Sequence, residues 1–135
     1  MQKYMCLFIS LLIVLFIQNC NPMMQIAQYQ YSDGSGNTYL IKKDSIQYIP
    51  VKPHESSSGV YDGGDPVKKE ISDESYQQLK KLIESASTKT EIHIKDRMMG
   101  SGLIKIDNKK EKVFILKPNT PEKKEIEDFL KSLIE

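Results

Sequence analysis

The stretch at positions 29–41 reads Tyr-Gln-Tyr-Ser-Asp-Gly-Ser-Gly-Asn-Thr-Tyr-Leu-Ile, and it decides the fold of this chain of 135 residues. Tyr29 and Tyr31 alternate with polar residues, as in a half-buried strand, and residues 38–41 favour a second strand. The segment between them, residues 33–37, is typical of a turn, and its Gly-Ser-Gly at 34–36 is too short for a phosphate-binding loop. The stretch therefore predicts a β-hairpin.

A third strand is expected at residues 45–51, where Pro50 marks a sheet edge or the end of the strand because proline donates no backbone hydrogen bond. The tyrosines of the three strands are expected to form a half-buried aromatic face. They are Tyr29, Tyr31, Tyr39 and Tyr48. Exposed tyrosines that bind glycans or partner proteins are the alternative. Residues 52–70 follow without any period and with several prolines and glycines, so a long loop is expected there.

Two amphipathic helices are expected further along the chain. Ser72 is placed to cap the first, at about residues 73–87, and Pro121 suits the first turn of the second because it gives up no hydrogen bond there. Apolar residues recur at helical spacing in both segments. They are Tyr76, Leu79, Leu82, Ile83 and Ala86 in the first, and Ile126, Phe129, Leu130, Leu133 and Ile134 in the second.

Three more strands are expected between the helices, at residues 90–94, 103–106 and 113–116, with a polar turn at 107–112. The predicted order is β-β-β-α-β-β-β-α. An antiparallel sheet of about five to six strands, with both helices packed on one face, is the simplest arrangement that buries the apolar stripes. The sequence therefore predicts a small α+β domain.

The N-terminus has the features of a secretory signal, because Lys3 precedes an apolar run at residues 5–17. The run has 13 residues, whereas a helix needs about 20 to cross the hydrocarbon core of a membrane. Its flank Ile-Gln-Asn-Cys, which ends at Cys20, resembles the lipobox of bacterial lipoprotein signal peptides. Secretion without a lipid and an uncleaved anchor are the alternatives.

The lipobox resemblance implies that residues 1–19 are removed as a signal peptide and that Cys20 is lipidated. Buried alkyl chains, at about 0.8 kcal/mol for each CH₂ group, then hold the protein on a membrane. We expect residues 20–27 to be a lipidated tether and residues 28–135 to be a single domain. By analogy with lipoprotein sorting in enteric bacteria, Asn21 favours the outer membrane of the cell envelope.

Composition limits the partners of the mature chain. The sequence has 19 Lys and Arg against 18 Asp and Glu, so loss of Lys3 with the signal leaves a side-chain charge of zero. Without a basic surface, nucleic acid is not an expected partner. Of the two cysteines, Cys6 lies in the signal and Cys20 carries the lipid, so no disulfide is expected and the domain must rely on its core.

The long loop holds the best candidate for a surface that contacts a partner. Serine and glycine offer hydrogen bonds at low steric cost, while Val60 and Tyr61 supply an apolar anchor. The candidate residues of the loop are Ser56, Ser57, Ser58, Val60, Tyr61, Asp62 and Asp65. A solvated connector, with Tyr61 held at the edge of the core, is the alternative.

This loop, followed by a helix and then by His93, Arg97 and a Gly-Ser-Gly at 100–102, resembles a group of small uncharacterised bacterial lipoproteins. These proteins carry a Ser-Ser-Ser-Gly-x-Tyr-x-Gly-Gly-x-Pro loop, often with serine at the position of Asp62. The resemblance covers most of residues 46–104 and implies no activity. It implies that the loop and the segment 93–102 form one structural unit, so His93 and Arg97 join the candidate contact residues.

Catalytic and metal sites find little support in the sequence. His93, Asp96 and Arg97 are a group suited to acid–base work or anion binding, but a histidine on the polar face of a sheet is far commoner. The serines of the loop lack a Gly-x-Ser-x-Gly nucleophile elbow. His54 and the acids that follow it lack the ligand spacing of zinc and calcium sites. We therefore expect no metal, no cofactor and no catalysis.

The expected function is that of a non-catalytic binding or structural module, held in the bacterial envelope by a lipid on Cys20 and in contact with an envelope protein. An inhibitor or immunity lipoprotein that blocks an exported hydrolase or toxin is the alternative. An envelope enzyme that uses His93 is the third hypothesis.

Overall fold

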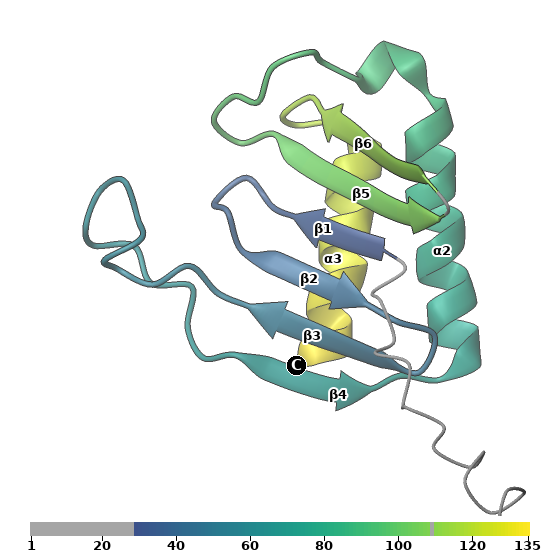
Figure 1. Cartoon of the computed structure of the whole chain (residues 1–135), viewed down its shortest axis with the longest axis horizontal. Coiled ribbons are helices and arrows are strands. Elements are labelled where there is room, and N and C mark those ends of the chain that lie inside the picture. The colour runs from purple at the N-terminus through teal and green to yellow at the C-terminus, as the bar shows by residue number, and fades with distance from the viewer. Residues whose placement is uncertain (1–28, 109) are drawn as a thin grey trace, which may run out of the picture.

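The computed structural model of the protein describes residues 29–108 and 110–135 (Figure 1). The predictions for the signal peptide, for lipidation of Cys20 and for the tether lie outside these residues. The strands are β1 (Tyr29–Ser32), β2 (Thr38–Ile41), β3 (Ser45–Ile49), β4 (Val67–Glu70), β5 (Gly102–Asn108) and β6 (Lys110–Leu116). The helices are α2 (Asp73–Thr88), the 3₁₀ helix η2 (Thr90–Ile92) and α3 (Pro121–Ile134).

The described strands form one sheet of six, in the order β4-β3-β2-β1-β5-β6. Every neighbouring pair is antiparallel. The predicted hairpin pairs Tyr31 with Tyr39, and the same row continues to Tyr48 on β3 and to Ile104 on β5. The sheet and its two long helices confirm the α+β class, with β1 inside the sheet and β4 and β6 at its edges.

Both long helices cover the same face of the sheet, as predicted, and α3 runs behind the strands in Figure 1. Tyr29 and Tyr31 are two positions apart on β1, so their side chains point to one face. The Tyr29 hydroxyl donates to Glu84 of α2 and the Tyr31 hydroxyl donates to Glu127 of α3, each over 2.9 Å. The two glutamates therefore mark where each helix crosses the sheet.

The aromatic face predicted across the first three strands is the centre of the core. Tyr29, Tyr31, Tyr39 and Tyr48 are each at most 8% exposed, so they are buried rather than half-buried. The ring centroids of Tyr31 and Tyr39 lie 6.4 Å apart, and those of Tyr39 and Tyr48 lie 5.0 Å apart. Each such contact stabilises the fold by about 0.5–1.5 kcal/mol beyond the area that it buries. The helices close the core with Leu79, Ile83, Ala86, Ile126 and Leu130.

The strand predicted at residues 90–94 is wrong. Helix α2 begins at its predicted cap, where the Ser72 hydroxyl accepts from the backbone N–H of Ser75, but it continues to Thr88. The chain then makes one 3₁₀ turn, η2, and a single β-bridge from His93 to Leu116. Because α2 and η2 take up the chain as far as Ile92, only His93 pairs with β6.

The sixth strand is instead β4, within the segment 52–70 that was predicted to be a loop. Its sequence, Val-Lys-Lys-Glu, has no apolar alternation because three of its four side chains are exposed at the sheet edge. Lysine is common on edge strands, where it discourages pairing with other chains. The last hairpin also extends further than predicted, since most of the polar segment 107–112 is paired in β5 and β6.

Alkaline pH should unfold the domain. Burial, reinforced by Glu84 and Glu127, raises the pKa of Tyr29 and of Tyr31 well above its usual value. In an unfolded chain a tyrosine ionises at about pH 10. Each tyrosine that stays protonated in the folded state then lowers the free energy of unfolding by about 1.4 kcal/mol per pH unit above that point. Above about pH 10 the unfolded state has lost protons that the folded state keeps, so stability falls as pH rises. Urea denaturation at increasing pH, with tyrosinate absorbance as a second signal, measures this.

Tyr31→Phe is the control for this alkaline unfolding, because it removes one such phenol and keeps its ring. Its stability should fall less steeply with pH than that of the parent. Tyrosinate that forms in full while the domain remains folded would contradict the buried state of these hydroxyls.

Candidate functional site

Three of the connections at one end of the sheet lie together, and we call these three segments the loop end. They are residues 33–37, 50–66 and 95–101, and they lie together on the left of Figure 1. The antiparallel register places the end of β1, the start of β2, the end of β3 and the start of β5 in one row, so these connections leave the sheet side by side. Every candidate residue of the long loop, and also Arg97, belongs to the loop end.

Asp33 organises the connection between β1 and β2. Its carboxylate accepts hydrogen bonds from the backbone N–H groups of Ser35 and Asn37, each over 2.9 Å, and from the side-chain amide of Asn37 over 2.8 Å. Aspartate often binds the backbone of the residues that follow it in a turn. The turn therefore holds the Asn37 side chain in one orientation.

Asn37 joins this turn to the long loop and is only 4% exposed. Its amide nitrogen donates to the Tyr61 hydroxyl over 2.7 Å, and its amide oxygen accepts from the backbone N–H of Val51 over 3.0 Å. A Cβ atom on Gly63 would lie 2.3 Å from that oxygen, so only glycine fits there. Asn37 thus closes the stem of the loop.

The rest of the stem is closed by hydrogen bonds to the sheet and within the loop. The Tyr48 hydroxyl donates to the backbone oxygen of Gly63 over 2.7 Å, and the Gly63 N–H donates to the oxygen of Val51 over 2.9 Å. The ammonium group of Lys52 donates to Gly64 over 2.6 Å and lies 3.6 Å from the Asp62 carboxylate. The loop is therefore braced where it leaves the sheet.

The tip of the loop extends beyond this stem. The hydroxyls of Ser56 and Ser58 are hydrogen-bonded over 2.9 Å, whereas Ser57 and Asp65 are exposed. Val60 is 81% exposed. Tyr61 is partly buried, and its hydroxyl accepts from Asn37, so it holds the loop at the edge of the core. This position of Tyr61 is the one expected if the loop is a solvated connector.

A second braced turn carries two methionines that the sequence reasoning missed. Met98 is 57% exposed and Met99 is 94% exposed. The Ser101 hydroxyl, fully buried, donates to the Met98 oxygen over 2.6 Å and accepts from its N–H over 3.2 Å. Gly100 has a φ of 78°, which favours glycine. The turn therefore presents both methionines on a fixed backbone.

Arg97 connects the methionine turn to the rest of the loop end. Its guanidinium donates to the backbone oxygen of Asp33 over 2.7 Å. A Cβ atom on Gly34 would lie 2.7 Å from the Gly100 backbone, so the two connections are in close contact. The long loop and the methionine turn thus both rest on the β1–β2 connection, one through Asn37 and the other through Arg97.

His93 does not belong to the loop end. Its Nε2 atom lies 2.9 Å from the backbone oxygen of Ala86, and its ring centroid lies 5.3 Å from that of Phe114. The histidine therefore packs on the end of α2, while Arg97 is turned toward Asp33. Within residues 29–108 and 110–135, no group of three His, Cys, Asp or Glu side chains is arranged to hold a metal ion.

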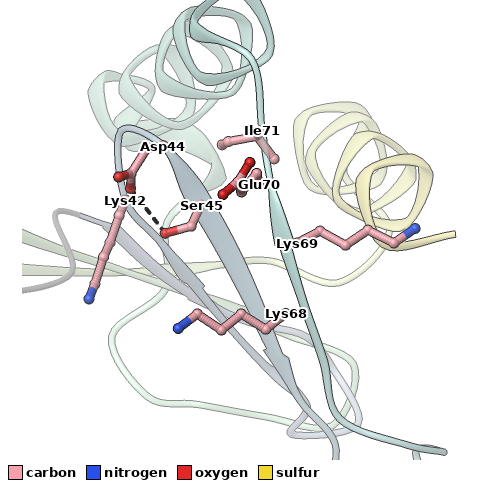
Figure 2. A pocket seen from close by; sticks show the side chains of 7 residues that line it. All are labelled: Lys42, Asp44, Ser45, Lys68, Lys69, Glu70 and Ile71. Atoms are coloured by element: carbon pink, nitrogen blue, oxygen red, sulfur yellow. Dashed lines mark hydrogen bonds between the residues drawn. The ribbon is translucent and has the colours of Figure 1, made fainter.

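A hollow at the opposite end of the sheet, between the β2–β3 turn and β4, contains no predicted site residue (Figure 2). Lys68 and Lys69 line it, but they point to opposite sides of β4. The Asp44 carboxylate accepts a hydrogen bond from the Ser45 hydroxyl over 3.1 Å. The ammonium groups of Lys68 and Lys69 therefore do not form a common binding site.

No protein-family model, curated protein or solved structure matches the chain. In the part of the chain that the structure describes, no helix is both long enough and apolar enough to cross a membrane. The geometry of the loop end is therefore the basis for a proposed function.

Asn37→Ala should loosen the long loop. The substitution removes the donor to Tyr61 and leaves the partly buried N–H of Val51 without its acceptor, at a cost of about 1–3 kcal/mol. We expect faster amide exchange at Val51 and Gly63, and proteolysis within residues 55–60. The matched control is Gln47→Ala on the exposed side of β3. Equal exchange in both variants would show that Asn37 does not close the loop.

Proposed function

We propose that the protein is a non-catalytic binding module of the bacterial cell envelope, anchored through a lipid on Cys20, and that the loop end contacts its partner. The proposal rests on the apolar side chains that the loop end exposes on an ordered backbone. The described residues include five exposed large apolar side chains, and three of them, Val60, Met98 and Met99, are on the loop end. A fourth, Ile49, is the last residue of β3, next to the loop end.

The bracing of these side chains favours binding. A surface that is already ordered loses little conformational entropy when a partner covers it. Hydrogen bonds at Asn37 and Ser101 hold the two backbones that carry Val60 and the methionines. Methionine also adapts its shape to a partner because its side chain is unbranched and polarizable. The loop end thus combines a fixed backbone with adaptable side chains.

The position of β1 supports an orientation in which the loop end faces away from the membrane. Tyr29 begins β1 at the end of the sheet opposite the loop end, which starts after Ser32. The chain between Cys20 and Tyr29 reaches at most about 30 Å when fully extended. The chain that leads from a lipid on Cys20 would therefore join the domain at the end opposite Val60 and Met99.

The protruding tip of the long loop also favours the inhibitor or immunity hypothesis. Small residues and an exposed Val60 on a braced, convex segment suit insertion into the cleft of a hydrolase or toxin. An enzyme that uses His93 has no such support, because that ring packs on the end of α2.

Photocrosslinking in intact cells tests the contact surface. A photoreactive residue in place of Val60 or Met99 should capture the same envelope protein, because both positions lie on the loop end. The same residue in place of Glu125, exposed on α3, is the control and should not capture it. Capture of one protein from all three positions, or from Glu125 alone, would rule out the loop end as the surface.

The anchor is tested separately by Cys20→Ala. Loss of the acyl chains should move the protein from the membrane fraction to the soluble fraction. Retention of this variant on the membrane would contradict lipid anchoring, whatever the crosslinking shows.

A further inference from the structure

The outer edge of β6 is half filled by the chain itself. The N–H of Ile94 donates to Ile115 over 2.9 Å, and the N–H of Lys117 donates to Ile92 over 2.8 Å. These bonds begin a further antiparallel strand beside β6, but the chain then turns away toward the loop end. The edge is therefore shaped to accept a strand and is covered over only part of its length.

The remaining part of this edge has backbone groups that point outward. In a strand, the N–H and C=O of one residue point to the same side, and this side alternates along the chain. The backbone oxygen of Ile115 accepts its hydrogen bond on the side away from β5. Val113 and Glu111 therefore also direct their N–H and C=O groups to that side. No backbone hydrogen bond from the described residues reaches them on that side.

A hollow lies beside this open edge, between β6 and the C-terminal half of α2. Ile106 and Phe114 form an apolar floor on the helix side of the sheet, and α2 contributes the hydroxyl-bearing residues Ser87 and Thr88. Lys110 and Lys112 stand at the rim, with Glu84 as the acid of the lining. Two ammonium groups against one carboxylate give the hollow a net positive charge.

We propose that this edge binds an extended peptide, which adds to β6 as a strand and places alternate side chains in the hollow. Backbone bonds to Glu111 and Val113 supply affinity, and the hollow selects side chains. The peptide residue opposite Phe114 is expected to be apolar, and the peptide residue opposite Lys112 is expected to be acidic. A second apolar residue of the peptide, on the other face of the sheet, covers Val113, which is 46% exposed.

The charges on β6 select an acidic peptide over a second copy of this chain. Antiparallel pairing of β6 with itself would set Lys112 opposite Lys112, or Glu111 opposite Glu111 with Lys110 opposite Lys112. Pairing centred on Val113 would need the backbone oxygen of Ile115, which already accepts from Ile94. Like charges directly opposite each other destabilise a strand pair. An incoming strand with acids opposite the lysines meets no such repulsion. This site does not depend on the loop end.

Amide exchange followed by NMR tests the proposal with a defined probe. The probe is the peptide acetyl-Leu-Val-Glu-Thr-Glu-amide, and its matched control has lysine in place of both glutamates. The acidic peptide should slow exchange of the Glu111 and Val113 N–H groups. It should bind roughly five- to tenfold more tightly than the lysine peptide, since two cross-strand charge pairs change sign.

Variants at the two edges complete the test. Lys112→Glu should abolish the preference between the peptides, since one of the two charge pairs then favours each peptide, whereas Lys68→Glu, on the opposite edge strand, should leave it unchanged. Absence of protection at Val113, or protection at β4 instead, would overturn the proposal. Binding that disappears in Met99→Ser but survives Lys112→Glu would place the peptide at the loop end and also reject the β6 site.

Discussion

Two hydrogen bonds from one strand connect the layers of this domain. Tyr29 and Tyr31 on β1 donate to Glu84 of α2 and to Glu127 of α3. A buried hydroxyl without an acceptor costs about 1–3 kcal/mol, so each tyrosine favours the one helix position that supplies a carboxylate. The ring of Tyr31 also belongs to a buried aromatic row that continues across β2 and β3. The placement of both helices, and hence of the connection that follows α2, depends on this strand.

The parts of the fold that sequence predicts well are those in which each segment carries its own signal. The hairpin at 29–41 and both helices follow from alternation, caps and helical spacing, which are local properties. β4 has no such signal, because its Val-Lys-Lys-Glu is ordered by pairing with β3. Residues 90–94 show the reverse case, since their alternation favours a strand while the extension of α2 to Thr88 leaves them only one bridge.

The loop end was located from the sequence, but its architecture was not. Tyr61 and the glycines of the long loop identify that loop as a candidate site. The residue that closes its stem, Asn37, lies 24 positions before Tyr61. Nothing local to a Gly-Asn turn indicates that its amide will be buried against a distant loop. The pair Met98 and Met99 had a usable signal, because the Gly-Ser-Gly that follows them at 100–102 marks a turn, and turns usually lie at the surface.

The position of β1 has a mechanical consequence. Tension on the chain ahead of Tyr29 acts along a strand that is paired on both sides, with β2 and with β5. Because hydrogen bonds in an antiparallel ladder lie perpendicular to the strand, such a load shears them together instead of opening them one by one. A partner bound at the loop end, as proposed, would pull along nearly the same axis. Force applied at Tyr29 would then pass first into β2 and β5, the strands paired with β1.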